Sequence, residues 1–210
     1  MFLNQLKQRC LNCLCSFKNK TYINSSKSVT TSAAVLSVNI GSFYDPHECQ
    51  GLSHLLEHML FCGSKKYPKN NHFSHYISKR GGFSNAVTNF LTTTYHYTIN
   101  PLHFEKSLDI FANFFHNPLL LESAVDNEIQ SVDNEYNLAK SNDSVRINCL
   151  IFTLFTKECS FNKFNLGNRK SLIENPKQNG ISPYNLLRKH FNSYYSASGM
   201  KLTVQSCQFK

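Results

Sequence analysis

The chain has 210 residues and a formal net charge of +9, with 41% hydrophobic and 17% charged residues. This composition is globular, with enough apolar residues for one sizeable core, and it excludes an intrinsically disordered chain. No apolar run approaches the roughly 18 residues that a membrane span needs, so we expect a soluble protein with no membrane partner.

The positive charges are scattered along the chain. No run of Lys and Arg exceeds two residues, and no aromatic platform is interleaved with them. We therefore interpret the charge as a solvated surface and predict no nucleic-acid partner, with an acidic protein partner as the alternative.

The N-terminal region is poor in acids, since Asp45 is the first acidic residue. Such a segment is typical of organelle transit peptides, so a mitochondrial location is the alternative to the cytoplasmic one that we expect. The eight cysteines are too sparse for a secreted disulfide scaffold and favour free thiols. Cys10, Cys13 and Cys15 resemble part of a zinc site, but no second pair with zinc-finger spacing follows.

Hydrophobic periodicity and turn residues predict the secondary structure. In chain order, the expected elements are a strand at 33–40, helices at 52–61 and 73–80, extended segments at 83–90 and 93–99, helices at 102–116 and 122–140, a less regular stretch holding Pro176 and Gly180, a helix at 183–195 and a strand at 201–205. Strands and helices alternate without a strict βαβ rhythm. The predicted class is therefore α+β, with a mixed, mainly antiparallel sheet packed against helices.

Residues 54–58 read H-L-L-E-H within the helix expected at 52–61. On a helix, His54 and His58 lie on one face, which suits two imidazoles that bind one Zn²⁺ ion at roughly 2.0–2.1 Å. Glu57 is close enough to reach a water molecule there without being a ligand. This order of residues is the inverzincin form of the zinc-hydrolase motif, although so short a motif also arises by chance.

The helix at 122–140 offers a third ligand. Glu128 and Glu135 are seven residues apart and therefore lie on nearly the same face, beside the apolar stripe that contains Val125 and Val132. Carboxylates at the border of a core are costly unless they are paired or bound to a metal. Two solvated helix acids are the alternative interpretation.

Several segments together resemble the M16 family of zinc metallopeptidases, in its insulysin and nardilysin branch. They are GSFYDP, GLSHLLEHMLFCGSKKYP, GGFSNAVT, VDNEIQSVDNEYNLA and GNRKSL. The fourth segment resembles nardilysins more than insulysins. We therefore assign residues 33–210 to an M16 N-terminal, zinc-binding peptidase domain and residues 1–32 to a poorly matched N-terminal segment.

The resemblance implies roles for the residues at the matching positions. His54, His58 and Glu135 would bind one Zn²⁺ ion, and Glu57 would be the general base. Glu128 would support the site from outside the ligand set.

The resemblance also implies a place for the substrate. Asn85 and Ala86 match an edge strand on which the family binds an extended peptide by main-chain pairing, and Phe61 matches a residue of the pocket just past the scissile bond. Ordinary strand and core packing is the alternative for these three residues.

The implied function is that of a zinc metalloendopeptidase that cleaves peptides, including peptides with basic residues. Enzymes of this branch have four homologous domains around a chamber, and their transition-state-stabilising Arg and Tyr come from the half that this chain does not resemble. We therefore expect a fragment of a four-domain protein that forms a homodimer or pairs with the missing C-terminal domains. The alternative is a truncated, non-catalytic homologue that binds zinc and peptide.

Overall fold

The computed structural model describes residues 21–26 and 30–207, so the predictions for Cys10, Cys13, Cys15 and a transit segment lie outside the described residues. A five-stranded sheet forms the base of the fold, with the strand order β1-β5-β2-β4-β3. Its strands are β1 (Thr21–Asn24), β2 (Ser32–Val38), β3 (Phe83–Thr88), β4 (Thr93–Ile99) and β5 (Met200–Gln205). β1 is parallel to β5, and the other pairs are antiparallel.

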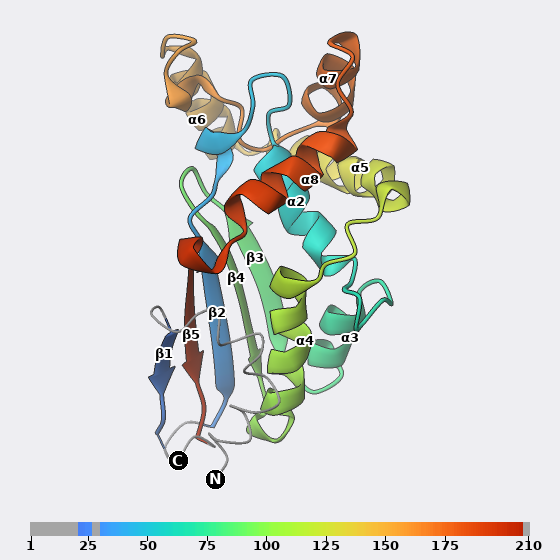
Figure 1. Ribbon diagram of the computed structural model, residues 1–210. Helices are drawn as coiled ribbons and strands as arrows, with labels where there is room; N and C mark the ends of the chain where they lie inside the picture. The colour runs from blue at the N-terminus through green and yellow to red at the C-terminus, as the bar shows by residue number, and fades with distance from the viewer. Residues whose placement is uncertain (1–20, 27–29, 208–210) are drawn as a thin grey trace.

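Helices pack against this sheet and extend beyond it (Figure 1). Those in the described residues are α2 (Leu52–Phe61), α3 (His72–Ser78), α4 (Phe104–His116), α5 (Glu122–Ala139), α6 (Asp143–Thr153), α7 (Asn175–Gln178) and α8 (Pro183–Tyr194). α3 and α4 lie side by side along the sheet, whereas α6 and α7 lie at the far end of the molecule (Figure 1). The α+β class and the mixed sheet predicted from the sequence are confirmed.

One core joins the sheet to the helices. The strand residues Leu36, Tyr95 and Tyr97 are buried against the apolar faces of α2 and α4. Aromatic rings fill much of this space; for example, the rings of Tyr97 and Phe111 are 5.1 Å apart and nearly edge to face. The core therefore fixes α2 against the sheet, and this places the H-L-L-E-H segment.

Most predicted elements are confirmed within one or two residues. The helix at 52–61 matches α2, and α8 begins as expected, with the Ser182 side chain accepting a hydrogen bond from the Asn185 amide and Pro183 in the first turn. The prediction of a less regular stretch before α8 is wrong over much of its length. That stretch contains α6, a π-helical turn at Lys170–Glu174 and α7, which starts at Asn175 with Pro176 in its first turn.

Among the described residues, the structure contains no helix that is both long enough and apolar enough to cross a membrane.

Candidate metal centre

Helix α2 presents its two faces to different surroundings. Leu55, Leu56 and Met59 are fully buried in the core. The motif residues His54, Glu57 and His58 instead line a cleft of about 620 Å³. The same 3.6-residue periodicity that anchors the helix therefore aims two imidazoles and one carboxylate into the cleft.

The side chains of His54, His58 and Glu135 form a compact group. Their nearest ligand atoms all lie within 4.8 Å of one another. The Glu135 carboxylate oxygen is 3.6 Å from Nε2 of His54 and 3.5 Å from Nε2 of His58. These separations exceed ordinary hydrogen bonds and are close to the roughly 3.3 Å between two ligands of a tetrahedral zinc ion. The donor set and its spacing fit Zn²⁺.

The outer nitrogen of each imidazole has its own partner. Nδ1 of His54 is 2.6 Å from the carbonyl oxygen of Leu166, and Nδ1 of His58 is 3.5 Å from the Glu128 carboxylate. A histidine that donates from Nδ1 leaves the lone pair of Nε2 free for a metal, and such partners are usual at metal-binding histidines. The Nε2 atoms of His54 and His58 therefore both face Glu135.

Glu57 lines the same cleft but has a different partner. Its side chain is buried, and one carboxylate oxygen accepts a hydrogen bond of 2.6 Å from the Thr88 hydroxyl at the end of β3. Burial raises the pKa of Glu57, and the bond from Thr88 opposes this shift. A carboxylate whose pKa lies above its ordinary value is a better proton acceptor.

The carboxylates and the histidines of this group shift one another's pKa values. Burial lowers the pKa of His58, but the carboxylates of Glu128 and Glu135 outweigh burial and raise this pKa to about 9. Burial also opposes the charge on His54, and Glu135 and the Leu166 carbonyl reverse that effect, so the pKa of His54 is raised. The two histidines in turn hold the pKa of Glu135 below its ordinary value.

The residues predicted to bind substrate also line the cleft. Asn85 and Ala86 belong to β3, which is at the edge of the sheet and pairs only with β4 among the described strands. Phe61, at the last position of α2, contacts the core through the Phe114 ring 5.4 Å away and forms part of the cleft wall. The structure thus brings these three residues to the same cleft as the histidine pair.

Three groups that hydrogen-bond to the candidate site residues were not predicted from the sequence. Thr88 lies on the strand that was predicted, and its alternation with Ala86 could have placed it in the cleft. The Cys62 thiol donates to the Glu128 carboxylate at 3.3 Å. Its position four residues after His58 could have placed it on the same face of the helix. The Leu166 carbonyl had no signal, because a backbone group carries no mark in the sequence.

Together, an α+β domain, two histidines one helical turn apart, a glutamate from a second helix and a nearby buried glutamate define the class of the zinc-dependent peptidases with an inverted motif. Comparison with known proteins agrees with this class. The family model described as "Insulinase (Peptidase family M16)" matches residues 20–162, which is more than half of the chain. The chain belongs to the M16 family, whose members are zinc metallopeptidases.

Similar proteins include nardilysin and insulin-degrading enzyme. Nardilysin of Rattus norvegicus is 42% identical over 175 residues, which cover 83% of this chain and 15% of nardilysin. Insulin-degrading enzyme of Homo sapiens is 40% identical over 185 residues, covering 88% of this chain and 18% of the enzyme. A crystal structure of pitrilysin superposes with a TM-score of 0.85 at 29% identity and covers 90% of this chain and 20% of the pitrilysin chain. The chain therefore spans a fifth or less of the length of these relatives.

Proposed function

We propose that this chain is the zinc-binding part of a metalloendopeptidase that hydrolyses peptide bonds. The observation that supports this most is the separation of the His54, His58 and Glu135 ligand atoms, which suits one tetrahedral zinc ion. Three protein ligands leave one position open for water, as catalytic zinc sites require. When bound, the ion would lower the pKa of that water and polarise the peptide carbonyl.

In this proposal Glu57 moves the proton. Its carboxylate takes a proton from the attacking water and delivers it to the departing amine, which typically contributes about 10²- to 10⁴-fold in rate. Thr88 holds the carboxylate from the side of β3. A peptide paired with the free edge of β3, beside Asn85 and Ala86, would therefore lie next to the base.

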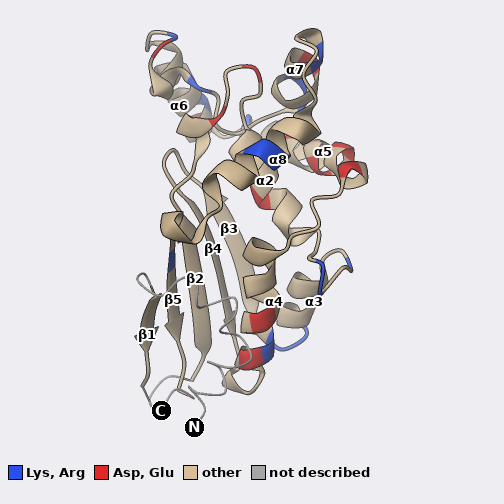
Figure 2. Cartoon of the chain, viewed as in Figure 1, with Lys and Arg blue, Asp and Glu red and all other residues tan. Residues whose placement is uncertain are grey.

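The charge around the cleft supports a preference for basic peptides. Helix α5 carries five acidic residues and no Lys or Arg, although the whole chain has a net charge of +9. Figure 2 shows these acids on α5 beside α2, whereas Lys and Arg are spread over several other elements. Two of these acids, Glu128 and Glu135, line the cleft. Negative charge there attracts cationic groups of a substrate, so we infer peptides with Lys or Arg near the cleaved bond.

The test measures zinc content and peptide cleavage of the purified chain and of Glu57→Gln. We expect one zinc per chain in both proteins and, when a second copy or added C-terminal domains of a relative complete the chamber, cleavage at least about 100-fold faster in the parent than in Glu57→Gln. Zinc without cleavage in either protein, even after C-terminal domains of a relative are added, would favour the second candidate, a non-catalytic homologue that binds zinc and peptide. This second candidate is worth testing because the chain covers only 15% of nardilysin and 18% of insulin-degrading enzyme. Absence of zinc would contradict both candidates.

We also propose that activity requires a second half-chamber, from a second copy of this chain or from C-terminal domains of an M16 protein. This requirement has its own test. Sedimentation of the purified chain distinguishes a dimer from a monomer, and mixing it with C-terminal domains of a relative tests whether they restore cleavage. A monomer that cleaves peptide unaided would contradict this requirement.

A further inference from the structure

The start of helix α2 is built without a capping side chain of its own. Gly51 occupies the N-cap position with φ +90°, in the left-handed region that favours glycine, and it makes no side-chain cap. Helix N-termini leave backbone N–H groups unpaired, and these must find acceptors elsewhere. His54 follows within the first turn, so whatever holds this end of the helix also sets the position of His54.

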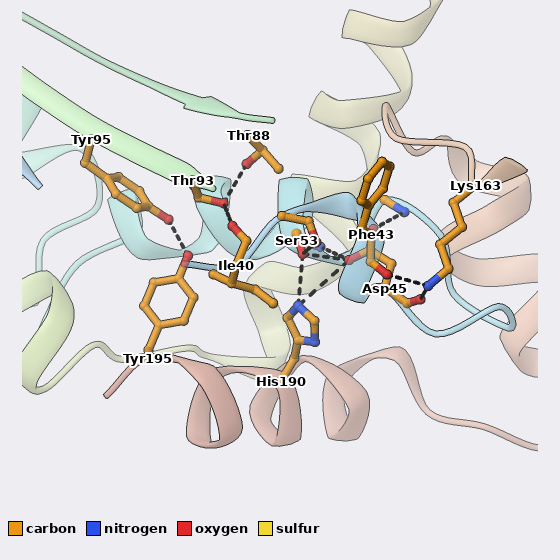
Figure 3. Close-up of polar contacts among 12 residues, drawn as sticks. Ile40, Phe43, Asp45, Ser53, Thr88, Thr93, Tyr95, Lys163, His190 and Tyr195 are labelled. Carbon is orange, nitrogen blue, oxygen red and sulfur yellow. Dashed lines mark hydrogen bonds and ion pairs between the residues drawn. The ribbon is translucent and has the colours of Figure 1, made fainter. Parts of the chain in front are cut away.

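The acceptor is the buried carboxylate of Asp45 from the preceding loop (Figure 3). One oxygen accepts from the Gly51 amide at 2.9 Å, and the other accepts from the Ser53 amide at 2.9 Å and the Ser53 hydroxyl at 2.6 Å. A negative charge at this end also complements the helix dipole. Asp45 thus acts as a cap supplied from outside the helix.

Helix α8 supports this cap through His190. Nε2 of His190 lies 2.9 Å from the Ser53 hydroxyl oxygen and 3.8 Å from the Asp45 carboxylate (Figure 3). Burial lowers the pKa of His190 to about 4, so at neutral pH the ring is uncharged. A neutral ring with its proton on Nε2 donates to Ser53, which in turn donates to Asp45. Each of the three buried side chains then takes part in at least one hydrogen bond of this network.

A second segment, residues 163–167, spans the same end of α2; we refer to it as the strap. The Lys163 ammonium donates to the carbonyl oxygens of Phe43 at 2.6 Å and Asp45 at 2.7 Å. Further along, the Phe164 amide donates to the Gln50 side chain at 2.8 Å. The strap is therefore bonded to the capping loop on both sides of the Asp45 cap.

The strap then touches both the helix and its first histidine. Gly51 and Gly167 pack so closely that a Cβ on Gly51 would lie 2.2 Å from Cα of Gly167. Between these points, the Leu166 carbonyl accepts from Nδ1 of His54 at 2.6 Å. The same five residues thus clamp the loop, abut the helix end and orient the imidazole.

We propose that the strap and the Asp45–Ser53–His190 network form one positioning device for His54, which presents Nε2 to the metal before the metal arrives. In this proposal the device acts through His54, so the residues argued here are positioning residues, although Asn165 and Leu166 of the strap also line the cleft. This inference rests on the proposed function, because it treats His54 as a ligand. Outer partners of metal-binding histidines typically change metal affinity by about 10- to 100-fold.

The test uses two variants with matched controls in the full chain. Lys163→Met removes the clamp between strap and loop, and Lys66→Met removes an ammonium that likewise makes two hydrogen bonds, at 2.9 and 2.7 Å, but to Asp109. Gly51→Ala forces the helix away from the strap. Gly180→Ala imposes similar backbone strain at φ +67°, where a Cβ would meet nothing within 4 Å.

The first measurement is the zinc dissociation constant, from competition with a chromophoric chelator. We expect about a tenfold rise for Lys163→Met, up to about a hundredfold rise for Gly51→Ala, and less than a twofold change in both controls. Thermal unfolding of the metal-free proteins shows that each variant is folded. Folded variants that keep the parent's dissociation constant would overturn the proposal, and if Gly51→Ala does not fold, Lys163→Met decides alone.

The second measurement does not depend on zinc. Nitrogen-15 shifts of the His54 ring, recorded without metal at a pH where the ring is neutral, report which nitrogen carries the proton. We expect Nδ1–H in the parent and controls, and a mixture of tautomers in both variants. A parent that fails to bind zinc contradicts the proposed function, whereas unchanged tautomers in the variants contradict the positioning device.

Discussion

The two helices that supply the candidate metal-binding side chains are held very differently. Most residues of α2 are buried, whereas α5 buries only Val125, Ile129 and Val132. Accordingly, the His54 side chain is 11% exposed and the Glu135 side chain is 54% exposed. Two of the three proposed ligands thus lie on a helix that is mostly buried in the core, whereas the third lies on a helix that contributes only three buried residues.

The strongest test of this comparison removes a ligand from each helix. His54→Ala and Glu135→Ala should both weaken zinc binding by at least about 1,000-fold, because two remaining ligands make a poor zinc site. Only His54→Ala should also destabilise the metal-free protein, by about 1–3 kcal/mol, since it leaves the Leu166 carbonyl without its partner. Glu135→Ala should cost less than about 1 kcal/mol, as for exposed ion pairs.

Chelator competition measures the first effect and urea unfolding of the metal-free proteins the second. Equal losses of unfolding free energy in the two variants would show that α5 is held as firmly as α2.

Protons should compete with zinc for the histidine pair. The pKa of His58 in the metal-free protein is raised to about 9, above its unfolded value near 6.5. At pH 7 zinc binding must therefore release a proton, and affinity should rise about tenfold per pH unit up to about pH 9. The stabilisation that His58 contributes to folding of the metal-free protein should change in the opposite sense, because it is fully present below pH 6.5 and is lost as the pH rises through 9.

Calorimetric titrations in buffers of different ionisation enthalpy measure the proton release. Zinc binding at pH 7 without proton release would contradict the assigned protonation of His58.

A smaller effect is expected from Glu128, which contacts the site without being placed as a ligand. Glu128→Gln should weaken zinc binding about 10- to 100-fold, because the amide is a poorer acceptor for Nδ1 of His58. Glu122→Gln, which changes an exposed acid in the first turn of the same helix, is the matched control. A loss as large as that of Glu135→Ala would instead make Glu128 a ligand.

Sequence reasoning succeeded where side-chain chemistry and burial coincide. Helix α2 was predicted at its observed bounds because apolar residues recur on one face and the motif occupies the other. His54, Glu57, His58 and Glu135 could be selected as candidates because side chains of these types at these spacings are typical of metal sites. The structure brings all four into one cleft.

Prediction failed where neither signal exists. No residue of α6 is buried, so its apolar residues do not mark an inward face. Pro176 suggested irregular chain, but it lies in α7, which directly continues the π-helical turn at Lys170–Glu174. The partner of His54 is a backbone carbonyl 112 residues away, and the capping network joins Asp45 to His190 from another helix. Such contacts depend on the tertiary fold.

The smallest expected effect comes from comparing one leucine on each of the two helices. Leu138 on α5 is 77% exposed, whereas Leu56 on α2 is fully buried. Leu138→Ala should change the free energy of unfolding by less than about 0.5 kcal/mol, because surface substitutions away from special contacts are nearly neutral. Leu56→Ala, the same chemical change, should cost about 2–5 kcal/mol by leaving a cavity in the core. Urea unfolding of both variants measures the difference, and a cost above about 1 kcal/mol at Leu138 would mean that another surface covers this end of α5.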